Sequence, residues 1–178
     1  MTMDQLGSIF TTAPTPVTWI LIYIVAQRLG ELVYANRNTR RLLSEGGEEF
    51  GADHYQYFIF LHSAWLAVIF LMVDPLHVLN PFLLSLFVGT QILRVWTLAS
   101  IGRWWTTRII SAPHFDLAKR GPYRFLNHPN YLIVVLEIAI VPLLMGLPWV
   151  ALLFSILNAI LLRHRIGVEN KVLALRKS

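Results

Sequence analysis

Long apolar runs constrain this chain more than any other feature. The runs cover 16–35, 55–73, 82–101, 131–145 and 149–162. The first three are near the length that a helix needs to cross a bilayer. At about 1.5 Å per residue the last two each reach only roughly 22 Å, so we expect a tight helical hairpin whose ends continue into the membrane interface. The sequence therefore predicts an all-α integral membrane bundle of about five transmembrane helices, forming one domain over 1–178.

Composition supports a membrane protein and excludes several kinds of site. Of the 178 residues, 56% are hydrophobic and 14% are charged, and the mean hydropathy is +0.56. A soluble monomer of this composition would leave large apolar patches in water. The absence of Cys from the sequence excludes disulfides, thiolate metal sites and thiol nucleophiles. The His residues lack the spacing that gathers metal ligands, so we expect no metal. The net charge of +5 falls outside the spans, which favours a role in topology over nucleic-acid binding.

Basic residues predict how the chain is oriented. Lys and Arg gather at 37–41, 103–124 and 163–177, whereas 1–15, 74–81 and 146–148 contain none. These two groups of segments alternate along the predicted spans. The positive-inside rule therefore places the N-terminus outside and the C-terminus in the cytoplasm.

Four charged residues lie within the predicted spans, where they are costly unless they are paired. Arg28 and Glu31 are three residues apart on one helix and can pair with each other. Arg94 and Glu137 are candidates for an ion pair between helices. A proton or ion path is the alternative interpretation. His62 is expected to be a helix-packing residue.

Polar residues concentrate in two segments, 102–131 and 163–170, which the predicted topology places on the same side of the membrane. Within the first, Gly121-Pro122 marks a turn and Pro129 suits the first turn of a helix. Free backbone N–H groups at such a helix start favour an anionic group. Taken alone, a turn, an interfacial Tyr pair and a basic loop are also ordinary features of membrane proteins.

One stretch of this loop carries a specific resemblance. It reads Gly121-Pro122-Tyr123-Arg124-Phe125-Leu126-Asn127-His128-Pro129-Asn130-Tyr131. An apolar hairpin follows, and then Arg165 with Glu169 four positions later. This pattern resembles the isoprenylcysteine carboxyl methyltransferase family, whose members share G-x-Y-x-x-x-R-H-P-x-Y, an apolar hairpin, and an Arg followed by an acidic residue.

The resemblance extends to a bacterial branch of that family associated with type III polyketide synthases. It is carried by 37–40, Glu49-Phe50-Gly51, His54-Tyr55, Arg94-Val95-Trp96 and 102–107. Two positions depart from the family pattern. Asn127 stands where the family has Arg, and Phe115-Asp116-Leu117-Ala118 stands where the family has H-x-L-V, with His114 one place out of register.

The resemblance implies a binding site for S-adenosylmethionine and a role for each matching residue. The implied cofactor contacts are Leu117, Ala118, Tyr123, His128, Pro129, Asn130, Tyr131 and Glu169. Arg165 is the implied substrate contact, and with His128 it forms the candidate catalytic pair. On one helix face, Arg165 can hold an anionic nucleophile beside the carboxylate of Glu169. The alternative is a plain surface ion pair. Trp104 and Trp105 fit an interfacial aromatic belt better than a cage around the sulfonium.

The implied activity is O-methylation in the membrane, dependent on S-adenosylmethionine. The acceptor is a carboxylate, phenol or enol oxygen of a lipophilic molecule such as a prenylcysteine or an alkylpyrone lipid. Acceptor and membrane lipid are the expected partners, and the site is expected at the cytoplasmic face of a bacterial inner membrane. Alternatives are a non-catalytic scaffold, a small transporter subunit, or a phospholipid N-methyltransferase, although Arg165 suits an anionic acceptor better than an amine.

Overall fold

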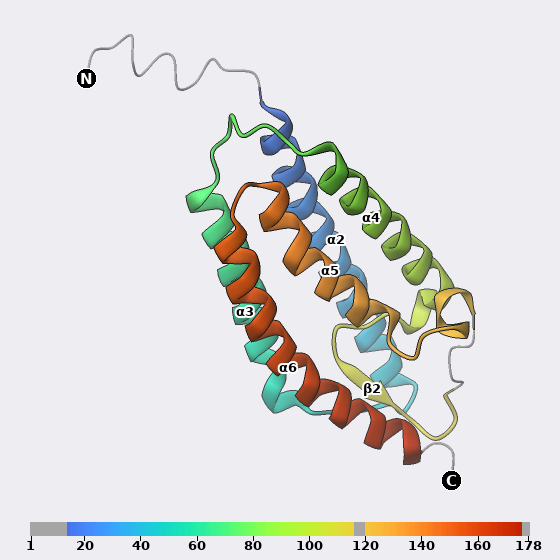
Figure 1. Ribbon diagram of the computed structural model, residues 1–178. Coiled ribbons are helices and arrows are strands. Elements are labelled where there is room, and N and C mark those ends of the chain that lie inside the picture. The colour runs from blue at the N-terminus through green and yellow to red at the C-terminus, as the bar shows by residue number, and fades with distance from the viewer. Residues whose placement is uncertain (1–13, 116–119, 176–178) are drawn as a thin grey trace, which may run out of the picture.

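The computed structural model describes residues 14–115 and 120–175, and it is nearly all helical (Figure 1). The helices are α2 (Pro16–Ser44), α3 (Ala52–Met72), α4 (Pro81–Ile101), α5 (Pro129–Leu144) and α6 (Pro148–Leu175). Two short 3-10 helices, η1 (Gly102–Trp104) and η2 (Gly121–Arg124), and two short strands, β1 (Glu48–Phe50) and β2 (Ile109–Ser111), complete the described part of the chain. The predicted all-α membrane bundle is confirmed.

Local sequence explains where the long helices begin. Thr15 caps α2, with its Oγ1 accepting from the Thr18 backbone N–H at 3.3 Å. Asn80 caps α4, and its Oδ1 accepts from the N–H groups of Phe82 (2.9 Å) and Leu83 (3.2 Å). In both helices proline follows the cap, where its missing N–H costs nothing.

Four of the five helices are long and apolar enough to cross a membrane, and α5 is a shorter apolar helix of 16 residues. The last helix continues well past the apolar run, to Leu175, so the hairpin is uneven in length. Helix α2 likewise extends through its basic end to Ser44, because no Gly or Pro occurs between Gly30 and Gly46. Large apolar side chains such as Phe60, Phe70 and Ile92 face outward, as expected for an integral membrane protein.

A cluster of charged side chains joins three helices inside the bundle. Arg94 on α4 donates to both carboxylate oxygens of Glu31 on α2, at 2.9 and 2.7 Å, and to Glu137 Oε1 on α5 at 2.9 Å. Arg28 bridges Glu31 (3.4 Å) and Glu137. Gln91 donates to Glu137 at 2.8 Å. Both predicted ion pairs are confirmed, and together they form one network with no net charge.

The basic segments meet at one end of the bundle. Figure 1 shows the C-terminal end of α2, strand β2 and the C-terminal end of α6 together there. Strand β1 pairs antiparallel with β2, with Glu48 opposite Ser111 and Phe50 opposite Ile109. This small sheet, which the apolar pattern did not predict, fastens the connection between α2 and α3 to the polar loop. Helix α6, which carries Arg165 and Glu169, contacts both strands.

Candidate methyltransferase site

A hydrogen-bonded chain links α5 to α6 at the basic end of the bundle. Arg165 Nε donates to the phenol oxygen of Tyr131 at 2.8 Å, and the Tyr131 hydroxyl donates to Glu169 Oε2. Tyr131 lies in the first turn of α5, whereas the other two residues lie one turn apart on α6. Arg165 is only 8% exposed. Arg165 and Glu169 are therefore joined through a phenol in a partly buried setting and are not a plain surface ion pair.

The guanidinium of Arg165 is held from two further directions. Its Nη2 donates to the Thr107 backbone carbonyl at 2.7 Å, and its carbon lies 5.1 Å from the centre of the Phe58 ring. Thr107 is fixed in turn, because its Oγ1 is 2.8 Å from the Tyr55 hydroxyl. A buried guanidinium with a fixed orientation is suited to binding an anion, since its planar N–H groups are already aligned.

His128 packs against the same phenol from the start of α5. Its ring stacks on Tyr131 with centroids 5.2 Å apart. Its Nε2 lies 3.0 Å from Asn170 Oδ1, and its Nδ1 lies 3.6 Å from Glu169 Oε2. Both ring nitrogens therefore face α6, and the imidazole helps to align the carboxylate of Glu169.

The other predicted cofactor contacts lie beside these hydrogen-bonded residues or outside the described residues. Tyr123 lies on η2, and burial together with the nearby charge of Glu169 raises the pKa of its phenol above the ordinary value. Pro129 is buried at the start of α5, and Asn130 follows it in the first turn. The predicted contacts Leu117 and Ala118 lie outside the described residues.

Several residues of the site were not singled out by the sequence. Phe58 gives no signal in the pattern, because it occupies an apolar position of α3 like its neighbours. Thr107 contributes a backbone carbonyl, which any residue type has. Asn170 follows Glu169 directly, so its polar amide beside a predicted site residue is a signal that the sequence does contain. Trp105 is buried, and its carbonyl accepts from Asn38 Nδ2 at 2.8 Å, so it packs within the basic end of the bundle.

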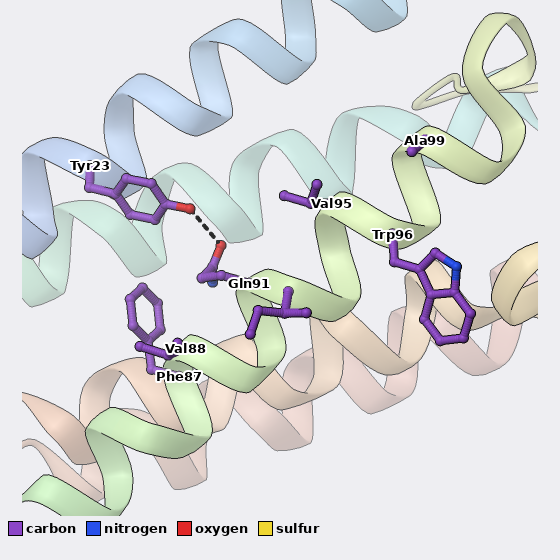
Figure 2. Close-up of a pocket in the computed structure, with 8 residues that line it drawn as sticks. Tyr23, Phe87, Val88, Gln91, Val95, Trp96 and Ala99 are labelled. Carbon is purple, nitrogen blue, oxygen red and sulfur yellow. Dashed lines mark hydrogen bonds between the residues drawn. The ribbon is translucent and has the colours of Figure 1, made fainter.

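A separate groove of about 550 Å³ lies on the outer side of α4, facing α2 (Figure 2). It is almost entirely apolar, and its one polar contact shown in Figure 2 is the hydrogen bond of 3.1 Å from the Tyr23 hydroxyl to Gln91 Oε1. Its lining consists of Tyr23, Phe87, Val88, Gln91, Ile92, Val95, Trp96 and Ala99. None of the candidate site residues that the structure describes lines this groove.

The fold and the site define a multi-pass membrane protein with a polar, partly buried site at the basic end of its helices. The model of the isoprenylcysteine carboxyl methyltransferase (ICMT) family matches residues 83–175, which include most of α4, all of α5 and α6, and the residues Tyr131, Arg165 and Glu169. The chain is also 38% identical over 160 residues to the uncharacterized protein YpbQ of Bacillus subtilis (strain 168). That match covers 87% of this chain and 95% of the relative. No solved structure matches the chain.

The chain belongs to the ICMT family. Membership implies a membrane methyltransferase, and methyltransferases of this family generally use S-adenosylmethionine. The predicted family is thereby confirmed. An association with polyketide synthases, the orientation in the membrane and the identity of the acceptor stay predictions.

Proposed function

We propose that the chain transfers the methyl group of S-adenosylmethionine to an oxygen of a lipophilic acceptor. The observation that carries this proposal is the set of hydrogen bonds from Arg165 through Tyr131 to Glu169, partly buried at the polar end of an otherwise apolar bundle. It places a fixed cation beside a carboxylate, which suits a site for one anionic and one cationic reactant.

The residues present fit S-adenosylmethionine. The side chain of Glu169 is 27% exposed, so its carboxylate can accept further hydrogen bonds from hydroxyl or ammonium donors. Its negative charge also favours a sulfonium. His128 Nδ1 lies 3.6 Å from this carboxylate, and the phenol of Tyr123 is close enough for the charge of Glu169 to raise its pKa. When bound, this cofactor supplies a methyl group that is already activated by the positive sulfur.

Arg165 and the apolar bundle bind the acceptor and exclude water. Arg165 binds and orients the acceptor oxygen as an anion, because its contacts with Tyr131 and Thr107 leave Nη1 free of partners in the described part of the chain. A carboxylate acceptor is ionised at neutral pH and needs no base, whereas a phenol or enol must lose a proton. The surrounding helices exclude water and admit a lipid-like acceptor from the bilayer. An amine acceptor would favour a carboxylate in place of this cation.

Calorimetric binding of S-adenosylmethionine and S-adenosylhomocysteine to the detergent-purified protein tests the proposal. Wild-type protein should bind both. Glu169→Gln should weaken binding roughly 10- to 100-fold, as expected when about 1.5–3 kcal/mol of charge-assisted hydrogen bonding is lost. Glu48→Gln, which removes an exposed carboxylate of β1, is the matched control and should bind normally. Absence of binding by folded wild-type protein would favour a scaffold or a transporter subunit.

We also propose that the site faces the cytoplasm of a bacterial inner membrane. The chain contains no Cys, so a single introduced Cys reports its own side of the membrane. Leu76 and Phe125 are 78% and 77% exposed at opposite ends of the bundle. In intact cells a membrane-impermeant maleimide should label Leu76→Cys and should label Phe125→Cys only after lysis. The reverse pattern would invert the orientation.

A further inference from the structure

His54 is a buried imidazole that takes no part in the hydrogen bonds joining Arg165, Tyr131 and Glu169. It lies in the first turn of α3 and is 8% exposed. Its Nε2 is shielded from solvent and has no hydrogen-bond partner among the described residues. A buried polar atom without a partner is uncommon in folded proteins and calls for an explanation, such as a ligand or a catalytic role.

The backbone before α3 holds this imidazole in place. Gly51 has a left-handed backbone, with φ of +64°, and the His54 ring lies directly over it. A Cβ at position 51 would fall 2.1 Å from Cε1 and 3.2 Å from Nε2 of the ring. Both the conformation and the close approach therefore require glycine here.

The imidazole borders the acceptor side of the proposed site. Its ring packs edge-on against His164 at 5.0 Å and against Phe58 at 6.3 Å between ring centres. The ring of Phe58 also contacts the guanidinium of Arg165, whose carbon lies 5.1 Å from the ring centre. His54 and Arg165 therefore share one aromatic neighbour, and both are buried at the basic end of the bundle.

We propose that His54 is a further catalytic residue, the general base that removes the proton from a hydroxyl acceptor held by Arg165. The inference rests on the proposed function and deepens it. Of the histidines near the site, His128 is poorly placed for this role, because its two ring nitrogens face Asn170 and Glu169. His54 offers a nitrogen with no partner among the described residues beside the cation that would stabilise the resulting oxyanion.

The step balances without any further reactant. The acceptor O–H bond breaks, its proton goes to His54 Nε2, and its electron pair stays on oxygen beside Arg165. That oxygen then forms the new C–O bond to the methyl group as the C–S bond breaks, and the sulfur leaves as a neutral thioether. The imidazolium gives up this proton to water as the methylated product leaves and water enters beside the ring.

The groups facing His54 are compatible with a neutral imidazole that gains a proton during the reaction. Arg165 and His164 face it from α6, and Asp53 precedes it on α3. The cation holds the acceptor oxyanion, and the carboxylate of Asp53 offsets part of the positive charge that forms on the ring.

Two measurements test this assignment on two variants. His54→Ala removes the imidazole, and Gly51→Ala displaces it. His77→Ala is the matched control, because that histidine lies between α3 and α4 at the other end of the bundle, where it packs against Gly146. The first measurement is methyl transfer to a long-chain alkylphenol and to a prenylcysteine carboxylate across a range of pH. The second is a pH titration, by absorbance, of a bound alkyl nitrophenol, and it requires no methyl donor.

We expect His54→Ala to lower kcat for the phenol about 100-fold or more at neutral pH, with little change in KM for S-adenosylmethionine. The loss should shrink as pH rises toward the acceptor's own pKa, and transfer to the carboxylate should be nearly unaffected. The bound nitrophenol should ionise at a higher pH in His54→Ala than in wild type. Gly51→Ala should act in the same direction.

Unchanged phenol transfer, an equal loss at every pH and with both acceptors, or wild-type transfer to carboxylates alone would each overturn the assignment. An unchanged nitrophenol titration would do so as well. Failure of wild-type protein to bind S-adenosylmethionine would instead overturn the proposed function. The nitrophenol titration would still report on His54 in that case.

Discussion

The charged cluster inside the bundle gives a prediction about stability that depends on charge balance. Arg94 and Glu137 are 1% and 3% exposed and contact each other directly. Replacing Arg94 by Met leaves an uncompensated carboxylate in the bilayer, and Glu137→Met leaves an uncompensated guanidinium. Loss of one member of a buried pair costs about 3–5 kcal/mol. We expect each single variant to lose that much unfolding free energy.

The double variant Arg94→Met with Glu137→Met should be more stable than either single variant. Arg28 and Glu31 remain paired at 3.4 Å, so the cluster stays neutral. Replacing a buried ion pair by apolar residues of similar volume costs little, so the double variant should lie within about 2 kcal/mol of wild type. Unfolding in one detergent, followed by the fluorescence of the six Trp residues, measures all four proteins. If the double variant loses as much unfolding free energy as the two single variants together, the reasoning is refuted.

Three further predictions concern single residues. Tyr131→Phe removes the hydroxyl that joins Arg165 to Glu169, and it should weaken binding of S-adenosylmethionine by calorimetry while leaving the helical circular dichroism unchanged. Asn80→Ala removes the cap of α4 and should lower the unfolding free energy by about 1 kcal/mol in the same detergent assay. Burial raises the pKa of Tyr123, so the folded state holds more protons than the unfolded state above pH 10, and stability should fall with pH there. Tyr123→Phe should make that fall shallower, whereas an unchanged slope would contradict the burial of this phenol.

The fold was largely predictable, because crossing a bilayer imposes a minimum length of apolar helix and requires internal pairing of charge. These demands identify the spans and explain why Arg28 meets Glu31 and Arg94 meets Glu137. The small sheet was not predictable from the same pattern. Its strands have three residues each and follow no apolar period, so only their pairing across the polar loop defines them.

The site was predictable where side-chain chemistry and spacing identify it, and not where backbone or packing does. Helical spacing placed Arg165 and Glu169 on one face, and His128 marked the start of α5. Spacing alone did not show that the Tyr131 hydroxyl stands between them. The carbonyl of Thr107 is equally invisible in a sequence, since its role follows from the path of the loop.

Transfer of a labelled methyl group by purified protein in liposomes tests the central claim most directly. Wild-type protein should move label from S-adenosylmethionine to an oxygen of a lipophilic acceptor, with prenylcysteine, alkylpyrone and phenolic lipids offered in parallel. Arg165→Ala should lose transfer while it still binds S-adenosylmethionine, because Arg165 is assigned to the acceptor. Folded wild-type protein that labels none of these acceptors, or Arg165→Ala protein that labels them as well as wild type, would contradict the account.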